Sequence, residues 1–304
     1  TEVSDLNTAR HGGGCVGATN KASLAFGGYS TNFAAITETW NGSNWTEVAD
    51  LNTARASFTG AGTTTSALAF GGNIGTPSFQ AITESWNGSS WTEVSDLNQS
   101  RYSLYGAGNS NTAALAAGGE EPPYTAKTES WNGSNWTTVN SLNTGRQSLK
   151  GAGTSTDALV FGGSSPVTGK TEKWNGTNWT EVNDLNTART LAGGFGIATS
   201  ALAFGGYYPT YYALTETWNG SSWTEVNDLN TARRDGGYTG DATAALAIGG
   251  QANTPPGSTS ATESWNGTNW TTLSATLNTD RGAAASSKIS IDSVNIIKSF
   301  QSSG

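Results

Sequence analysis

The sequence predicts an all-β fold, a β-propeller built from four-stranded units, and three observations support this prediction. A tryptophan-containing block repeats with a period of about 45 residues, which is typical of propeller blades. Each period contains four short apolar or alternating segments that are separated by Gly-rich or Asn-Gly turns. No segment shows a 3.6-residue apolar period over ten or more positions, so helix is expected to be essentially absent.

The second unit shows the expected elements in order. Ser57–Gly62 is small and glycine-rich, and we place it innermost because only small side chains let backbones approach closely near the axis. Ala67–Phe70 is an apolar second strand that ends at a Gly-Gly pair. Ala81–Trp86 and Trp91–Val94 alternate, and Asn87-Gly88 between them is a strong hairpin signal.

Three features recur along the chain at equivalent positions. The Gly-Gly pair occurs six times, at 27–28, 71–72, 118–119, 162–163, 205–206 and 249–250. The block W-N-G-x-x-W also occurs six times and contains every tryptophan: Trp40, Trp45, Trp86, Trp91, Trp131, Trp136, Trp174, Trp179, Trp218, Trp223, Trp265 and Trp270. An arginine ends an L-N-x-x-R-like segment seven times: Arg10, Arg55, Arg101, Arg146, Arg189, Arg233 and Arg281.

The period alone fits WD-type and kelch-type blades, and the residues resemble the kelch family. Gly71-Gly72 at the end of the second strand, Trp86 in the third, Trp91 five residues later and Arg101 opening the next unit follow the kelch order. The resemblance covers about residues 10–281 and implies a propeller, although Trp86 stands where the family more often has tyrosine. The near-identical repeats are also similar to those of uncharacterised bacterial and marine-phage proteins.

The two ends of the chain are predicted to close the ring. Residues 1–10 copy a fourth strand and its exit turn, and residues 281–304 begin like an innermost strand. An open propeller would leave two unpaired sheet edges. We therefore expect residues 1–304 to form one domain, with six full repeats at about 11–280 and a seventh, composite blade made from the two ends. Six blades with ordered extra ends is the alternative.

The repeated side chains are expected to build the scaffold. Paired tryptophans across a hairpin stabilise it and supply area for packing between blades. The repeated arginines match glutamates that stand two residues before the first tryptophan of each block, and guanidinium pairs bidentately with carboxylate. The alternative roles are sugar stacking for the tryptophans and an anion-binding ring for the arginines. The glutamates are Glu38, Glu84, Glu129, Glu172, Glu216 and Glu263.

The segments that follow each Gly-Gly pair differ between units, and they are the predicted ligand-binding loops. Strand alternation places all of them on one face of the disc, and variable loops on a rigid scaffold commonly carry binding. The alternative is that these loops simply drift and pack on their neighbours. The loop after residue 206 is the strongest candidate within the predicted aromatic set: Tyr29, Phe33, Phe79, Tyr124, Tyr207, Tyr208, Tyr211 and Tyr212.

The composition excludes several kinds of protein. A net charge of −8 opposes binding to nucleic acid. The single Cys15 excludes an internal disulfide and a cysteine-based zinc site. The single His11 excludes a site with two imidazoles, such as the copper site of the kelch enzyme galactose oxidase. No 18-residue apolar run and no signal-peptide pattern occur, so we expect no membrane insertion.

The sequence therefore predicts a non-enzymatic binding or structural module without catalytic residues, metal ligands or a cofactor. It is expected to be extracellular or virion-associated, to present its tyrosine-rich face to a protein or glycan partner, and to form part of a larger assembly. One alternative is a secreted carbohydrate-active enzyme that uses loop carboxylates such as Glu120 and Glu121. Another is a spacer without any ligand. An ion held by backbone carbonyls in the central channel stays open.

Overall fold

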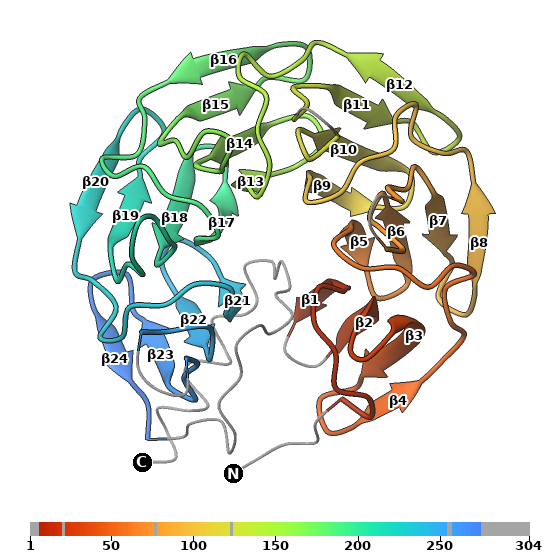
Figure 1. The fold of residues 1–304 in the computed structure, drawn as a ribbon, viewed down its shortest axis with the longest axis horizontal. Coiled ribbons are helices and arrows are strands. Elements are labelled where there is room, and N and C mark those ends of the chain that lie inside the picture. The colour runs from red at the N-terminus through yellow and green to blue at the C-terminus, as the bar shows by residue number, and fades with distance from the viewer. Residues whose placement is uncertain (1–5, 20–21, 76–77, 122–123, 254–256, 275–304) are drawn as a thin grey trace.

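The computed structural model describes residues 6–19, 22–75, 78–121, 124–253 and 257–274. Over these ranges the chain forms 24 β-strands and no helix. The strands make six sheets, each of four strands that are consecutive in sequence and antiparallel. Figure 1 shows the six sheets around a central axis, with the first strand of each innermost and the fourth outermost. The prediction of an all-β propeller is confirmed.

The sheets are called blades 1 to 6 in chain order. Blade 1 contains β1 (Gly14–Thr19), β2 (Ala22–Tyr29), β3 (Phe33–Trp40) and β4 (Trp45–Glu47). Blade 2 contains β5 (Thr59–Thr63), β6 (Ser66–Phe70), β7 (Thr83–Trp86) and β8 (Trp91–Val94). Blade 3 contains β9 (Tyr105–Ser110), β10 (Ala113–Ala117), β11 (Thr128–Trp131) and β12 (Trp136–Val139). Blade 4 contains β13 (Lys150–Gly153), β14 (Ala158–Phe161), β15 (Thr171–Trp174) and β16 (Trp179–Val182). Blade 5 contains β17 (Gly193–Ile197), β18 (Ser200–Phe204), β19 (Thr215–Trp218) and β20 (Trp223–Val226). Blade 6 contains β21 (Gly237–Gly240), β22 (Ala245–Ile248), β23 (Thr262–Trp265) and β24 (Trp270–Thr272).

The number of blades corrects the main prediction. Six blades match the stated alternative, and the seven-bladed interpretation is not supported. The segments assigned to the composite blade, residues 1–3 and 282 onward, lie outside the described residues, as does Arg281. The physical reason for the correction is visible in the sequence, because neither end contains the W-N-G-x-x-W block that joins the third and fourth strands of every described blade.

The tryptophan hairpins have one geometry in all six blades. The two tryptophans of each block face one another across the third and fourth strands, as Trp86 and Trp91 do. The Asn87 side chain accepts hydrogen bonds from the backbone N–H groups of Ser89 and Ser90, at 2.9 and 3.0 Å, and so closes the turn. Asparagine favours this local bond, and the glycine after it adopts a positive φ of 98°.

The second tryptophan of each pair also joins neighbouring blades. The Trp91 indole N–H donates to Thr37 Oγ1 of blade 1 at 3.0 Å, and the ring packs on Phe26 with centroids 4.8 Å apart. The same donation recurs in blades 3 to 6, from Trp136, Trp179, Trp223 and Trp270. In blade 1, Trp40 and Trp45 are half-buried, whereas the tryptophans of the other five blades are buried.

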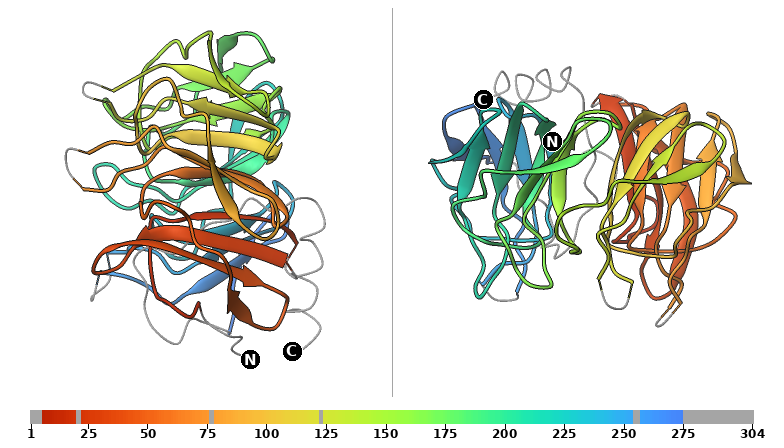
Figure 2. Two further views of the ribbon diagram at one scale, coloured as in Figure 1. Left: turned by 90° about the vertical axis from the view of Figure 1, so that its right-hand side faces the viewer. Right: turned by 90° about the horizontal axis from the view of Figure 1, so that it is seen from above.

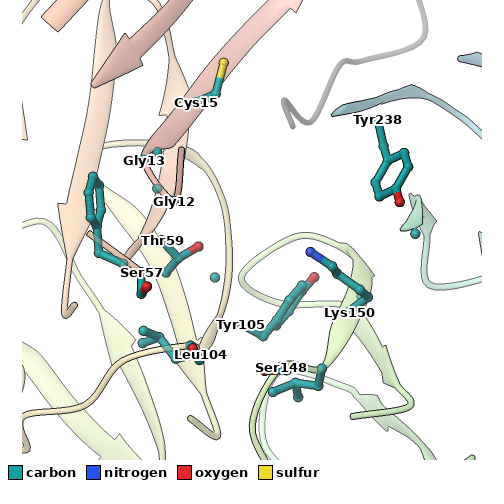
Figure 3. Close-up of a pocket in the computed structure, with 18 of the residues that line it drawn as sticks. Gly12, Gly13, Cys15, Ser57, Thr59, Leu104, Tyr105, Ser148, Lys150 and Tyr238 are labelled. Atoms are coloured by element: carbon teal, nitrogen blue, oxygen red, sulfur yellow. The ribbon is translucent and has the colours of Figure 1, made fainter. Parts of the chain in front are cut away.

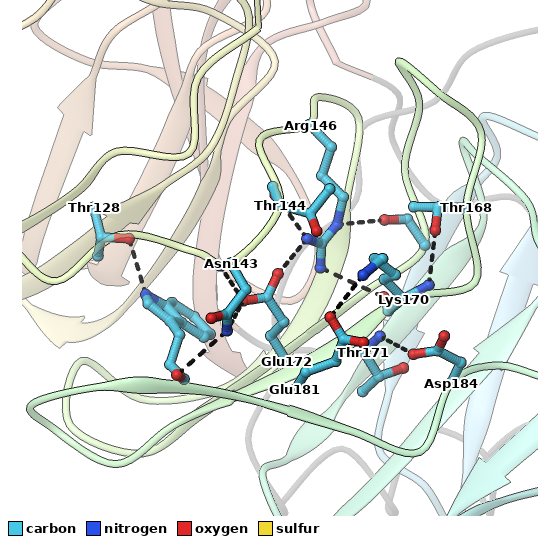
Figure 4. A network of polar contacts seen from close by, with 12 residues as sticks. Thr128, Asn143, Thr144, Arg146, Thr168, Lys170, Thr171, Glu172, Glu181 and Asp184 are labelled. Carbon is cyan, nitrogen blue, oxygen red and sulfur yellow. Dashed lines mark hydrogen bonds and ion pairs between the residues drawn. The ribbon is translucent and has the colours of Figure 1, made fainter.

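A buried polar network fixes the segment that enters each blade, and Figure 4 shows it in blade 4. Arg146 donates to Glu172 Oε1 at 2.5 Å and to the carbonyl oxygens of Thr144 and Gly162. The other oxygen of Glu172 accepts hydrogen bonds from the backbone N–H and side-chain amide of Asn143. Neither side chain of the ion pair is exposed to solvent. Equivalent ion pairs occur in the other five blades, with partners Arg10–Glu38, Arg55–Glu84, Arg101–Glu129, Arg189–Glu216 and Arg233–Glu263.

Glycines on the innermost strands receive side chains from the preceding blade. A Cβ atom on Gly106 would lie 2.6 Å from the side chain of Thr59, and one on Gly151 would lie 2.7 Å from the ring of Tyr105. Only a residue without a side chain fits at such a contact. In the edge-on views of Figure 2 these inner strands run roughly along the axis, so each has an end near either face of the disc.

Blade 1 departs from the predicted strand boundaries. We expected the second strand to end at the Gly-Gly pair and residues 29–36 to form a variable loop. Instead β2 continues through Gly27-Gly28 to Tyr29, and β3 already begins at Phe33. Tyr29 and Phe33 are paired in the ladder and their rings meet edge-on at 5.1 Å. Only residues 30–32 connect the two strands, so most of the predicted loop belongs to the β2–β3 hairpin.

Candidate functional site

Each blade brings two residues that differ between repeats to one rim of the disc. The residue after the repeated arginine forms an isolated β-bridge with the residue after the Gly-Gly pair of the same blade. The Gly-Gly pair is fixed from the next blade, since the Gly72 N–H donates to the Arg101 carbonyl at 2.9 Å. The resulting pairs, here called the rim, are His11–Tyr29, Ala56–Asn73, Tyr102–Glu120, Gln147–Ser164, Thr190–Tyr207 and Arg234–Gln251.

Most of the predicted aromatic residues pack against the rim or against one another. Tyr29 lies between His11 and Phe33, with ring centroids 5.8 and 5.1 Å away. Phe79 of blade 2 stacks on Tyr102 of blade 3 with centroids 5.0 Å apart. With these contacts the rings are half-buried.

The loop that we favoured, after residue 206, holds an arginine on its aromatic rings. The guanidinium of Arg234 lies 4.6 Å from the ring centroid of Tyr207 and 5.4 Å from that of Tyr211. Arg234 also donates to Gln251 Oε1 at 2.9 and 2.7 Å. Tyr207, Tyr211 and Tyr212 are half-buried, and the Tyr212 hydroxyl donates to the Tyr208 carbonyl. The two rings and Gln251 therefore fix the position of the Arg234 guanidinium on the rim.

Two members of the predicted set are exposed. Tyr124 and Tyr208 keep 43% and 52% of their surface accessible, and both lie in loops that follow a Gly-Gly pair. Ile197, at the far end of innermost strand β17, is equally exposed at 53%. The structure therefore divides the eight predicted residues into two exposed tyrosines and six half-buried aromatic residues.

A central cavity opens between the innermost strands, and Figure 3 shows its wall. Its volume is about 530 Å³, and the described residues that line it come from the first strand of every blade and the segment before it, together with Gln251 of the rim. The residue two positions before each innermost strand has a positive φ: Gly12, Ser57, Ser103, Ser148, Leu191 and Asp235. Their φ values lie between 51° and 66°, which is unfavourable for any residue with a side chain.

Backbone hydrogen bonds between blades hold part of this strained ring in place. The Ser57 N–H donates to the Gly12 carbonyl at 2.7 Å, Ser103 to Ser57 at 2.9 Å, and Ser148 to Ser103 at 3.1 Å. These bonds connect blades 1 to 4 in succession. A strained backbone conformation persists only where the surrounding structure holds it in place. Such conformations are concentrated at functional sites.

Lys150 is the one lysine or arginine among the described residues that line the cavity. Lys150 is the first residue of β13, where the other blades have Gly14, Thr59, Tyr105, Gly193 and Gly237. Burial lowers the pKa of Lys150, and the nearby carboxylate of Asp235 opposes that change. Burial raises the pKa of Asp235, while Lys150 and Arg234 oppose the rise. The two phenols of the wall, Tyr105 and Tyr238, are buried, which raises the pKa of each.

The acidic residues, His11 and Cys15 are the candidates for catalytic or metal chemistry among the side chains that the structure describes. No group of three His, Cys, Asp or Glu residues suitable for a metal ion occurs in those ranges. Glu120 forms the rim pair with Tyr102, and the adjacent Glu121 is half-buried. His11 lies on the rim and Cys15 lines the cavity. Within the described part of the chain, no helix has the length and apolar character needed to span a membrane.

Comparisons with known proteins show the fold. No protein-family model and no curated protein matches the sequence. The chain is similar to a solved structure titled "Structure of YjhT", with a TM-score of 0.68 and 12% sequence identity, over 89% of this chain and 99% of that one. This similarity and the six-bladed geometry support a kelch-like β-propeller. At that level of identity the likeness carries no information on activity or ligand.

Sequence reasoning did not find Lys150, Asp235 or the three cavity serines as functional candidates. A partial signal was present, because the Lys150 position is glycine in three described blades and the serine position is serine in three, while the remaining blades differ. We predicted binding only in the loops and expected a uniform, glycine-rich first strand. The positive φ values that place the serines at the cavity have no local sequence signature of their own.

Proposed function

We propose that this protein is a non-enzymatic binding module whose rim and adjoining loops recognise a protein partner. The observation that carries the proposal is where the repeats differ. Residues of the ion-pair and tryptophan network are copied from blade to blade, whereas the rim pairs and the loops beside them change in every blade. Variation confined to the connections of a rigid scaffold is the pattern of a recognition surface.

The chemistry of the rim favours a protein surface as the partner. Tyrosine and arginine are enriched among residues that dominate protein interfaces, and the rim holds Arg234 on Tyr207 and Tyr211. Tyr124 and Tyr208 extend this surface with exposed rings. An extracellular or virion-associated location is part of the proposal, as is membership of a larger assembly.

The experiment compares two exposed apolar residues from opposite ends of the blades. The wild-type protein is screened against a peptide display library and a glycan array, and bound peptides are titrated against Tyr208→Ala and Ile197→Ala. We expect peptide binding that weakens at least tenfold in Tyr208→Ala and is unchanged in Ile197→Ala. Binding only to glycans contradicts the choice of partner, and equal loss in both variants contradicts the choice of face.

A test for hydrolysis addresses the enzymatic alternative. The wild type and Glu121→Gln are incubated with a panel of polysaccharides, and the release of reducing ends is measured. The proposal expects no turnover by either protein. Turnover that disappears in Glu121→Gln would establish the carbohydrate-active enzyme instead.

A further inference from the structure

We propose that the central cavity is a binding site for a small organic carboxylate, with Lys150 as its cationic anchor. This site adjoins the rim at His11 and Gln251, but the proposal does not depend on a protein partner. Its volume of about 530 Å³ lies in the range of small-molecule pockets. In Figure 3, Lys150 and Tyr105 extend from one side of the cavity and Tyr238 lies on the opposite side.

The first argument is the unused hydrogen-bonding capacity of Lys150. An ammonium group has three donors, yet Lys150 has no hydrogen bond to any residue that the structure describes and no ion pair within 4.0 Å there. At the equivalent place in blade 3, Tyr105 donates its hydroxyl to the Ala152 carbonyl at 3.1 Å. Lys150 is half-buried in the wall of the cavity, so its ammonium group is available to donate to an anion bound there.

The second argument is the balance of charge around the cavity. Asp235 is the carboxylate nearest to the site, and it lies 3.6 Å from the guanidinium nitrogen of Arg234. Its charge is therefore shared between Arg234 and Lys150. Because Arg234, which does not line the cavity, takes up part of the Asp235 charge, Lys150 can also pair with a ligand that carries one negative charge.

The third argument identifies the class of anion. Ser57, Ser103 and Ser148 line the cavity, and their hydroxyl groups form no hydrogen bond within the described ranges. A carboxylate has two oxygens, of which one can accept from the ammonium and the other from a hydroxyl. Phosphate recognition commonly uses an arginine fork, and no arginine lines this cavity among the described residues. Buried Tyr238 and Phe195 give the wall apolar surface that suits an organic group.

The test exploits the residues that other blades have at this position. Lys150→Thr places the blade 2 residue in blade 4, and Lys170→Thr removes an outer lysine that pairs with Glu181 at 2.7 Å. Acetate, L-lactate and D-gluconate are the probes, acetamide and D-glucose are their neutral counterparts, and inorganic phosphate is tested beside them. Dissociation constants are measured by ligand-observed NMR.

We expect at least one carboxylate to bind, no binding of the neutral counterparts, at least tenfold weaker binding to Lys150→Thr, and unchanged binding to Lys170→Thr. Absence of carboxylate binding, or equal affinity in Lys150→Thr, overturns the proposal. Tighter binding of phosphate than of any carboxylate also overturns it.

A second measurement follows the NMR signal of Lys150 itself, so the test of the proposal does not depend only on the variant. The lysines are reductively ¹³C-methylated, which keeps their charge, and the Lys150 resonance is identified by comparison with Lys150→Thr or Lys150→Tyr, the blade 3 residue. Titration with the bound carboxylate should shift the Lys150 signal and leave the Lys170 signal in place. A shift of other lysines without Lys150 rejects the anchor.

Discussion

The outer and inner parts of each blade are subject to different physical constraints. In the outer part, Arg146 pairs with Glu172 of the same repeat, and the other five blades contain an equivalent ion pair. At the axis, the first residue of the innermost strand is glycine in blades 1, 5 and 6, and it is Thr59, Tyr105 and Lys150 in blades 2, 3 and 4. A side chain with a buried, charged partner cannot change alone, whereas one that faces an open cavity can. Positions that are the same in every blade therefore maintain the fold, and positions that differ between blades are available for recognition.

The largest expected effect is the loss of one buried ion pair. Arg146→Met leaves the Glu172 carboxylate buried without its cation, and we expect the free energy of unfolding to fall by about 3–5 kcal/mol. The matched control is Lys170→Met, whose exposed pair with Glu181 should contribute less than about 1 kcal/mol. Guanidinium chloride unfolding measures both. Comparable losses in the two variants would show that burial does not distinguish the pairs.

A smaller effect is expected from the tryptophan contacts between blades. Trp223→Phe removes the hydrogen bond to Thr171 Oγ1, which is 2.9 Å long, and part of the packing on Phe161. We expect a loss of about 2 kcal/mol. The same substitution at half-buried Trp45 should have a smaller effect. Thermal unfolding of the two variants tests this difference, and a larger loss at Trp45 would contradict our account of the interface.

The fold was predictable because its determinants recur within one repeat. Trp86 and Trp91 with the Asn-Gly turn between them define a hairpin, and repetition at a constant period defines a propeller. The predicted blade count was wrong. The two ends of the chain lack the tryptophan block, so their assignment to a seventh blade depended only on the principle that sheet edges avoid exposure. The cavity was missed because its residues depend on contacts between blades. Ser148 reaches its place through a hydrogen bond to Ser103, about one repeat away in the sequence.

The strained ring around the cavity permits a stabilising substitution. Ser148 has a φ of 53°, a conformation that glycine adopts without steric conflict. Ser148→Gly should relieve strain and lose some stability through the more flexible unfolded chain, with a net gain of about 0.5 kcal/mol. Ser134→Gly, in an exposed turn, should give no gain. Denaturant midpoints measure both changes, and a loss of stability in Ser148→Gly would show that its hydroxyl matters more to the fold than its backbone strain.

The smallest expected effect is a pH dependence of stability that belongs to Lys150. Because burial lowers its pKa in the folded protein, the unfolded chain binds more protons between that lowered pKa and the ordinary value of 10.5. The contribution of Lys150 to stability therefore rises as the pH increases through this window. The difference in unfolding free energy between the wild type and Lys150→Thr should shift in favour of the wild type as the pH approaches 10.5. Lys170→Thr should show the opposite trend, because its ion pair with Glu181 raises the pKa of Lys170 and is lost at high pH. Parallel curves for the two variants would mean that water solvates Lys150 in the cavity as it solvates a surface lysine. The axis and the outer part of the blades would then not differ in their effect on a lysine charge.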